Sequence, residues 1–326
     1  MDDQPPSLDN HVTATVVAPA FGGPEVLALV DEPIRDPGPG EVVLQVRAAG
    51  TNPVDYKMYS GSFGRDPAQL PIRLGLEAAG VVTAVGDGAA GADGPVHAGD
   101  EVIAFRITGG YASEVIVPGS AVVHKPSTLS FEQAGGLLLV GATAVHTLHV
   151  TGVGAGDTVL IHGASGGVGL MAVQLAVNLG ARVIATASDG HHDYLLQLGA
   201  EPVTYGDGLV ERIRDLAPDG VQAAIDTVGT TEAIDVSIAL APERDRIATL
   251  VAIQRGFELG LKVLGGAPGA DPGTEIRAAA RIELVEQADA GKLQVLVSAA
   301  YPLADAGTAH RALAAGHTQG KIVLVP

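Results

Sequence analysis

A glycine-rich segment, Gly163–Gly169, is the part of the sequence whose residues and spacing point most directly to chemistry. Small residues let the main chain approach a ligand closely, and N–H groups at a helix start bind phosphate. The spacing matches the G-x-G-x-x-G fingerprint of dinucleotide-binding proteins, except that an alanine replaces the first glycine. The alternative is a tight turn without a ligand. We predict a pyrophosphate-binding turn made of Gly163, Ala164, Ser165, Gly166, Gly167 and Val168.

The residues after the next expected strand indicate which dinucleotide binds. An acidic residue about twenty positions after the glycines would bond the ribose 2′-hydroxyl of NAD, but position 188 is a serine, and Asp189 is expected to turn away. Ser188, His191 and the later Tyr205 can all donate hydrogen bonds to a phosphate. For the histidine, the alternative is a solvated helix start. We predict a pocket for a 2′-phosphate, and therefore NADPH as the cofactor.

A strand–helix–strand unit must position these residues. Thr158–His162 and Arg182–Ala187 are short apolar runs typical of buried parallel strands, and Leu170–Leu179 carries the apolar stripe of a helix. The alternation continues to Gly266, which predicts a doubly wound parallel sheet, the Rossmann fold. Further strands are expected at 202–205, 222–226, 246–251 and 261–265, with helices at 191–198, 208–216 and 231–239.

Residues that directly follow two of the later strands are expected to border the nicotinamide. In such a sheet, ligands bind outside the carboxyl ends of the strands. This rule adds four residues to the expected cofactor path, namely Val228, Leu250, Val251 and Ala252.

The N-terminal part of the chain has a different pattern. Residues 12–106 form short alternating segments separated by Gly and Pro, which predicts a small antiparallel β domain. Helices are expected at Phe131–Val150, with a break near Gly141, and at Thr274–Asp289, and the last strand, Lys321–Val325, is expected to return to the first domain. We predict a catalytic domain of residues 1–125 and 270–326 and a dinucleotide-binding domain of residues 126–269.

Composition excludes several classes of protein. The net charge of −18 argues against nucleic-acid binding, which requires a basic face. Because the chain has no cysteine, it has neither disulfides nor thiolate chemistry. The sequence has no uninterrupted apolar run that could span a membrane, and residues 1–10 lack the apolar core of a signal peptide. We expect a cytoplasmic protein that acts on a small molecule.

Several segments, in order along nearly the whole chain, resemble the zinc-free, zeta-crystallin-like quinone oxidoreductase branch of the medium-chain dehydrogenase/reductase superfamily. They include A-A-G-T-N-P-V-D-Y-K at 48–57, G-L-E-A-A-G-V-V-T-A-V-G at 75–86, G-G-Y-A-S-E-V-I-V-P at 109–118, H-G-A-S-G-G-V-G at 162–169 and H-T-Q-G-K-I-V-L at 317–324. The resemblance implies a GroES-like antiparallel domain joined to a Rossmann domain, with NADPH as cofactor. It also implies a homodimer, for which strand edges at Leu261–Leu264 could pair.

The resemblance also implies roles for individual residues. Asn52 should lie in the active-site cleft, where it can bond the substrate oxygen or a water; the alternative is that it only forms a turn before Pro53. Thr143 should face the nicotinamide. Tyr56 and Tyr59 could line the pocket with a hydroxyl as proton donor; the alternative is that they only pack the loop. Lys321 can approach the cofactor or hold the two domains together; the alternative is an exposed strand lysine without either role. Structural roles are expected for Asp55 and Glu77, and a structural or phosphate-side role for Lys57.

Two positions bear on the strength of the NADPH preference. Tyr205 matches the family's tyrosine that meets the 2′-phosphate. His191 stands where relatives have a lysine, and a neutral histidine offers less charge to the phosphate. The resemblance therefore implies a moderate preference.

The zinc ligands of other superfamily members are missing. Those members place cysteine and histidine at the equivalents of Asn52, Leu76 and the region of Val140, none of which is a ligand here. With no cysteine, a four-thiolate structural site cannot form either. Without a metal to polarise a carbonyl, hydride transfer requires either an acceptor that is activated by conjugation or hydrogen-bond donors at the developing oxyanion. Quinones, enones and enals meet the first condition. We therefore predict a zinc-independent, NADPH-dependent reductase of quinones or α,β-unsaturated carbonyls.

Two other functions fit the same scaffold. One is an enoyl-thioester or polyketide-intermediate reductase, and the other is a catalytically silent NADPH-binding protein. Oxidation of NADPH with quinones, enones and enoyl thioesters would distinguish the three.

Overall fold

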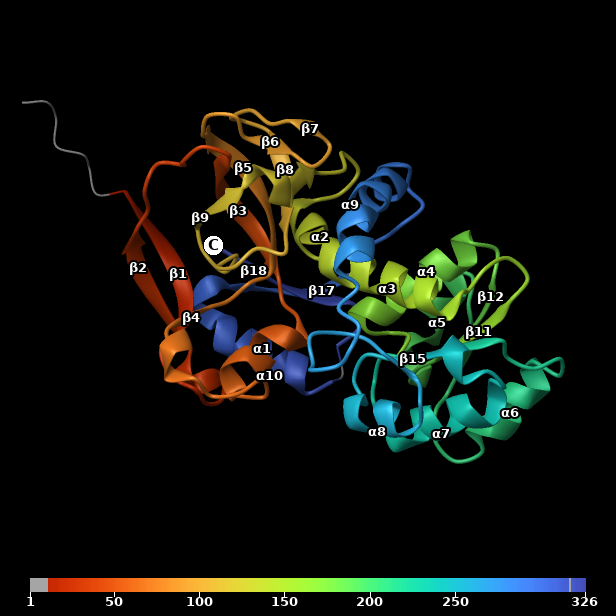
Figure 1. Ribbon diagram of the computed structural model, residues 1–326. Helices are drawn as coiled ribbons and strands as arrows, with labels where there is room; N and C mark the ends of the chain where they lie inside the picture. Colours follow the sequence, from red (N-terminus) through yellow and green to blue (C-terminus); the bar gives the residue numbers. More distant parts are fainter. Residues whose placement is uncertain (1–10, 317) are drawn as a thin grey trace, which may run out of the picture.

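Two kinds of sheet organise the chain in the computed structural model, which describes residues 11–316 and 318–326 (Figure 1). One sheet is parallel and runs in sequence from β11 (Thr158–His162) to β16 (Lys262–Val263). The other sheets are largely antiparallel and contain the N-terminal strands and the last two strands. We call the two halves the parallel lobe and the antiparallel lobe. This is the α/β fold class that the sequence predicts, with a GroES-like and a Rossmann-like part.

The parallel sheet has the strand order β13-β12-β11-β14-β15-β16. This is the doubly wound order 3-2-1-4-5-6, in which the crevice for a ligand opens where the order reverses, between β11 and β14. The remaining strands are β12 (Arg182–Thr186), β13 (Glu201–Val203), β14 (Ala223–Asp226) and β15 (Ile247–Thr249). The expected strands are therefore confirmed, and five of the six are one to three residues shorter than predicted.

Helices cover both faces of this sheet (Figure 1). Apolar side chains of α4 (Gly167–Asn178) and α5 (His192–Gln197) belong to the core on one face. Those of α6 (Leu209–Leu216) and α7 (Thr231–Leu240) belong to the core on the other. A further short helix, α8 (Ile253–Glu258), follows β15 and was not predicted.

The antiparallel lobe is built around a sheet with the order β10-β8-β5-β3-β18-β17, and β9 also pairs with β3. Its strands are β3 (Glu41–Gly50), β5 (Glu77–Val85), β8 (Glu101–Phe105), β9 (Glu114–Pro118), β10 (Val122–His124), β17 (Val297–Pro302) and β18 (Lys321–Val325). The smaller strands are β1 (Val12–Ala18), β2 (Ala28–Pro33), β4 (Ile72–Arg73), β6 (Ala90–Gly91) and β7 (Gly94–Pro95), and the helices of this lobe are α1 (Pro53–Ser60) and α10 (Ala306–Ala314). Since β18 pairs with β3, the last strand returns to the first lobe, as predicted.

The helical stretch between the lobes breaks at a different place from the one expected. The chain forms α2 (Phe131–Gly135) and α3 (Leu138–Thr151), so Gly141 lies inside a helix. The predicted break near Gly141 is wrong because this glycine serves packing. A Cβ at this position would lie 3.0 Å from two methyl carbons of Leu284 on α9 (Thr274–Asp289), which lies alongside α3 (Figure 1).

Within the described part of the chain, no helix is both long and apolar enough to cross a membrane.

Candidate active site

Two cavities lie near the carboxyl ends of the parallel strands. The larger, about 540 Å³, lies between the lobes and is lined from both; we call it the inter-lobe cavity. The smaller, about 450 Å³, is lined mainly by residues at the ends of β11, β12 and β14; we call it the sheet-edge cavity.

The cavities collect most of the predicted site residues. The sheet-edge cavity is lined by Gly163, Ser165, Ser188, His191, Tyr205 and Val228. The inter-lobe cavity is lined by Asn52, Thr143, Val168, Leu250 and Val251. Seven other candidates line neither cavity, namely Tyr56, Tyr59, Ala164, Gly166, Gly167, Ala252 and Lys321.

The glycine-rich turn joins the two cavities, and its geometry explains its sequence. Gly163 has a φ of +69°, a conformation that favours glycine. A Cβ on Gly169 would lie 2.3 Å from the carbonyl oxygen of Gly163, so only glycine fits there. Ala164 is fully buried and points into the core, which is why a methyl group is tolerated at this position. The missing first glycine of the fingerprint therefore leaves the turn intact.

This turn presents free N–H groups at the start of α4. Gly166 is the N-cap and has no side chain to bond the first amides of the helix, which have no partner within the helix itself. The turn is held from the other lobe by a hydrogen bond from the N–H of Gly320 to the carbonyl oxygen of Ser165 (2.8 Å). The arrangement suits a pyrophosphate.

The sheet-edge cavity carries polar groups that can meet a phosphorylated ribose. Ser188 Oγ lies 3.3 Å from His191 Nδ1, and the Tyr205 side chain is exposed beside them. At the base of the cavity, His162 Nδ1 bonds Thr186 Oγ1 (3.2 Å), while its buried Nε2 has no partner among the described residues. Burial lowers the pKa of His162 to about 3, so its ring is neutral at physiological pH.

Two acidic residues near this cavity are engaged elsewhere. Asp189 is exposed and accepts a hydrogen bond from the hydroxyl of Thr204, which confirms that it turns away. Glu232, which sequence reasoning missed, lines the cavity and accepts a hydrogen bond from the N–H of Gly206 (3.0 Å). Its position at the start of α7 gave no local signal, because an acid in a first helical turn is ordinary.

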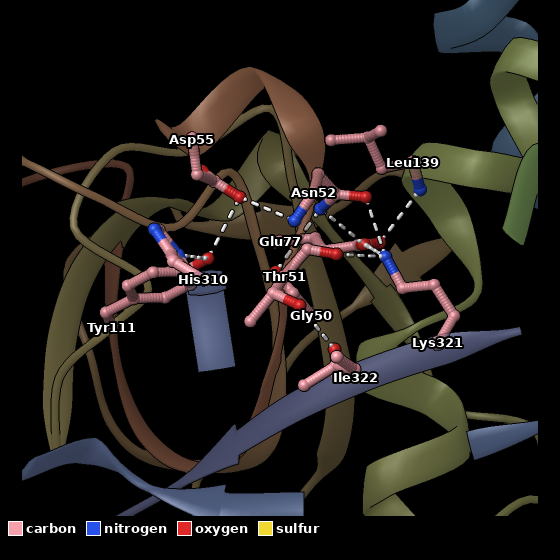
Figure 2. A network of polar contacts seen from close by, with 10 residues as sticks. All are labelled: Gly50, Thr51, Asn52, Asp55, Glu77, Tyr111, Leu139, His310, Lys321 and Ile322. Atoms are coloured by element: carbon pink, nitrogen blue, oxygen red, sulfur yellow. Dashed lines mark hydrogen bonds and ion pairs between the residues drawn. The ribbon is translucent and has the colours of Figure 1, made fainter. Parts of the chain in front are cut away.

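The amide of Asn52 is fully engaged in a buried network (Figure 2). Its Oδ1 accepts from Lys321 Nζ (2.6 Å), and its Nδ2 donates to Gly50 O (3.2 Å) and to Glu77 Oε1 (3.1 Å). Lys321 Nζ also bonds Glu77 Oε1 (3.1 Å) and Thr51 O (2.9 Å). The expected bond from Asn52 to a substrate oxygen would therefore have to displace one of these partners.

The same network joins the two lobes. Glu77 Oε2 accepts from the N–H of Leu139 in the first turn of α3 (2.8 Å), and Glu77 is completely buried (Figure 2). The stem of Lys321 passes close to Gly136 and Gly167, where an added Cβ would lie 3.1 Å from its carbons. Of the two roles expected for Lys321, its position favours holding the lobes together.

A second buried network links Asp55 of α1 to Tyr111 and His310 (Figure 2). Tyr111 donates to Asp55 Oδ2 (2.9 Å), His310 Nε2 lies 3.1 Å from the Tyr111 oxygen, and Tyr59 bonds His310 Nδ1 (2.9 Å). Asp55 Oδ2 also accepts from the N–H of Asn52 (2.8 Å). Burial raises the pKa of Asp55 to about 6 and lowers that of His310 to about 4.

The second network contains Tyr59 but not Tyr56, and neither tyrosine lines either cavity. Tyr59 is 1% exposed and stacks on His310, and Tyr56 packs against the core of the antiparallel lobe. Burial raises the pKa of both phenols further above its ordinary value. The loop-packing alternative therefore describes both residues better than the proton-donor role.

The inter-lobe cavity offers other polar groups. Thr143 and Lys57 line it, and the side chain of neither residue takes part in the networks above. Arg106 and Arg277 line it as well. Sequence reasoning missed both arginines, because only the fold brings residue 106 next to a helix that starts at residue 274.

No group of three or more histidine, aspartate or glutamate side chains is arranged to hold a metal ion within 11–316 and 318–326. At the positions of the zinc ligands, Leu76 lines the cavity with hydrocarbon and the amide of Asn52 is committed to its network. Neither group is a zinc ligand.

Two family models match the chain. The model of an alcohol dehydrogenase GroES-like domain matches residues 38–127, and that of a zinc-binding dehydrogenase matches residues 167–264. The first match lies in the antiparallel lobe, and the second covers the parallel sheet after β11.

Curated relatives match either part or nearly all of the chain. The mouse synaptic vesicle membrane protein VAT-1 homolog is 36% identical over 67% of this chain and 54% of its own length, so the chain spans about half the length of that relative. A quinone oxidoreductase of Pseudomonas aeruginosa is 33% identical over 94% of this chain and 98% of its own length.

Solved structures share the whole fold. Escherichia coli quinone oxidoreductase complexed with NADPH superposes with a TM-score of 0.82 and 31% identity, covering 96% of this chain and 100% of that one. The CurK enoyl reductase superposes with a TM-score of 0.83 and 26% identity, covering 97% and 99%.

Proposed function

Because the chain belongs to the quinone oxidoreductase family of the medium-chain dehydrogenase/reductase superfamily, we propose that it reduces quinones or α,β-unsaturated carbonyls with NADPH. One observation carries this proposal. The glycine-rich turn contributes Gly163 and Ser165 to the sheet-edge cavity and Val168 to the inter-lobe cavity. A dinucleotide whose pyrophosphate binds at this turn would extend one half into each cavity.

The residues present fit NADPH. The turn from Gly163 to Val168 would hold the pyrophosphate, and the neutral ring of His162, with its unpartnered Nε2, offers a hydrogen-bonding group at the base of the sheet-edge cavity. Leu250 and Val251 would border the nicotinamide from the parallel lobe. When bound, NADPH supplies a hydride to the acceptor, which also takes up a proton.

The proposed preference for NADPH over NADH rests on Ser188, His191 and Tyr205. Their donors face a cavity in which Glu232 is already bonded to a main-chain N–H. Charge-neutral donors favour a phosphate less than a lysine would, so we expect tighter binding of NADPH by a moderate factor. Fluorescence titration with both cofactors tests this, and a preference for NADH would contradict the roles of Ser188 and Tyr205.

The inter-lobe cavity supplies the groups for the acceptor. As hydride reaches the acceptor, negative charge develops on its oxygen, and the Lys57 ammonium and Thr143 hydroxyl can donate hydrogen bonds to it. Asn52 acts as a positioning residue, since its amide links α1 to Lys321 and Glu77. None of these steps requires a metal ion.

Steady-state oxidation of NADPH with quinones, enones and enoyl thioesters tests this function. We expect turnover with conjugated acceptors, none with saturated ketones, and unchanged rates after treatment with a chelator. Turnover with enoyl thioesters alone would favour the second candidate, for which the match to the CurK enoyl reductase is the supporting observation. Binding of NADPH without turnover of any acceptor would favour a catalytically silent protein.

We propose residues 126–269 as the cofactor domain, the remainder as the catalytic domain, a cytoplasmic location and a homodimer. The expected pairing at Leu261–Leu264 meets an obstacle, because the outer edge of β16 is already bonded. Asp271 N donates to Val263 O (2.8 Å), and Gly265 N donates to Asp271 O (2.9 Å). Sedimentation equilibrium tests whether a dimer forms despite this covered edge.

A further inference from the structure

The lining of the inter-lobe cavity has the opposite charge to the molecule as a whole. The chain has 37 acidic and 19 basic residues, yet Lys57, Arg106 and Arg277 line this cavity and no aspartate or glutamate of the described residues does. A strongly acidic protein repels anions over most of its surface. A local excess of positive charge inside the proposed acceptor site therefore points to a negatively charged ligand.

Arg277 is held in place by a short chain of side chains. Its Nε donates to His146 Nδ1 (3.2 Å), and His146 Nε2 lies 3.0 Å from Asp271 Oδ2. Burial lowers the pKa of His146, so the neutral ring accepts at Nδ1 and donates at Nε2. Arg277 Nη2 is buried and has no partner among the described residues. The guanidinium is thus oriented and keeps a free donor at the cavity.

Arg106 reaches the same cavity from the antiparallel lobe. It directly follows β8 and has a φ of +60°, the one positive φ among non-glycine residues in the described chain. Such a conformation is unfavourable for a long side chain and is enriched at functional sites. Its Nη1 donates to Thr274 O (3.2 Å), which places it beside the first turn of α9.

Arg106 lies close enough to Arg277 to disfavour the charge of Arg277. Burial, and then the charge of Arg106, lower the pKa of Arg277 below its ordinary value. Asp271 lies on the far side of His146 and only partly offsets this repulsion. An anion between the two guanidinium groups would remove it and supply the acceptor that Nη2 lacks.

We infer that the acceptor carries an anionic group, a carboxylate or a phosphate, which Arg106 and Arg277 bind in the inter-lobe cavity. This inference rests on the proposed reductase function and narrows its substrate class. The two arginines are specificity-determining residues, whereas Lys57 serves the oxygen on which charge develops.

Two matched pairs of acceptors test the inference. 4-Carboxycinnamaldehyde and its methyl ester differ by one carboxylate, and crotonyl-CoA and crotonyl-N-acetylcysteamine differ by the phosphorylated carrier. Because a hydrogen bond to a charged group contributes roughly 1.5–3 kcal/mol, we expect the wild-type KM to be about tenfold lower or more for the charged member of at least one pair. The pair that responds identifies the anion as carboxylate or phosphate.

Single substitutions test which residues cause the lower KM for the charged acceptor. Arg106→Met and Arg277→Met are each expected to raise the KM of the charged member about tenfold and to leave that of the neutral member unchanged. Lys57→Met should instead lower kcat for both members. Arg214→Met, on the exposed face of α6, removes the same charge and should change neither. Arg106 is exposed, so its variant provides the test if Arg277→Met does not fold.

Calorimetric binding of the same four compounds to the NADP⁺-loaded protein separates this inference from the proposed function. Charge-selective binding without turnover would support the anion site and refute the reductase. Turnover with equal KM and equal affinity for the two members in both pairs would refute the anion site and leave the reductase standing. A weaker affinity for NADPH in the arginine variants, with acceptor KM unchanged, would also overturn the inference, because the arginines would then serve the cofactor.

Discussion

Glu77 and Lys321 bring two charges into a place where water does not reach. Glu77 is 0% and Lys321 4% exposed, and their contacts fix the amide of Asn52 and the start of α3. Removing both charges from water is costly, and the pair is stable because every polar atom finds a partner. We therefore expect that replacing either residue alone lowers the free energy of unfolding much more than replacing both together.

A double-mutant cycle tests this coupling. Glu77→Gln leaves the Lys321 ammonium buried without a counter-ion, and we expect a loss of about 3–5 kcal/mol in the free energy of unfolding. Lys321→Met should cost a similar amount, and the double variant clearly less than the sum. Glu41→Gln breaks an exposed ion pair with Arg35 and serves as the control, with a much smaller expected change. Additive effects in denaturant titrations would contradict the coupling.

For single residues, local sequence pattern predicted the lining of the sheet-edge cavity better than the residues proposed to serve the acceptor. Ser188 and Tyr205 follow strands that the sequence places at one edge of a sheet, and both line the sheet-edge cavity. Tyr59 lies seven residues after Asn52 but points to His310, 251 residues further along the chain. No local pattern reveals such a long-range partner, and the same holds for Arg277.

Among the elements, the turn before α4 depends on close approach of main-chain atoms. A methyl group on Gly169 would overlap the Gly163 carbonyl, whereas a methyl group on Gly190 would meet nothing within 4 Å. Gly169 thus has no room for a side chain, whereas Gly190 has, and the two glycines form a matched pair for a substitution by alanine.

Gly169→Ala should distort the turn, destabilise the protein by roughly 1–3 kcal/mol and weaken NADPH binding. Gly190→Ala should leave both properties near those of the wild type. Denaturant titration and fluorescence binding measure the two effects. Wild-type affinity in a folded Gly169→Ala protein would show that the turn does not hold the cofactor.

The elements themselves were largely predictable, and the exception is informative. A glycine inside an apolar helical run usually marks a weak point, so a break at Gly141 was the natural prediction. The structure uses this glycine to bring α9 against α3. Only the tertiary contact with Leu284, absent from any local window, distinguishes the two cases.

For the whole molecule, three buried groups make stability depend on pH in opposite directions. His162 and His310 have pKa values lowered to about 3 and about 4, so their contribution is complete above about 6.5 and is lost as pH falls. Asp55 has a pKa raised to about 6, so its contribution is complete at acid pH and is lost as pH rises through that value.

Between pH 5 and 6, each of these histidines therefore makes the free energy of unfolding rise with pH. Asp55 makes it fall with pH, which offsets the effect of one histidine. His162→Gln removes one histidine, so the wild-type free energy of unfolding should rise more steeply than that of the variant by about 1.4 kcal/mol per pH unit. Parallel curves in denaturant titrations across this range would show that His162 is not buried in neutral form. His97→Gln, at an exposed histidine, is the control for the substitution itself.

The division into an antiparallel and a parallel sheet follows from the sequence, because the period of the apolar residues changes near residue 157. The return of β18 to β3 was predictable from the resemblance. The positive charge of the inter-lobe cavity was not predictable from the sequence. Lys57, Arg106 and Arg277 are contributed by α1, the segment after β8 and α9, which only the fold brings together.

We propose that hydride passes from the nicotinamide directly to a conjugated acceptor. Reduction of an enal with NADPH that is deuterated at the transferred position of C4, followed by NMR analysis of the product, tests this most directly. We predict deuterium on the β-carbon of a saturated aldehyde. Deuterium on the carbonyl carbon of an unsaturated alcohol, or a product without deuterium, would contradict direct hydride transfer to the conjugated acceptor.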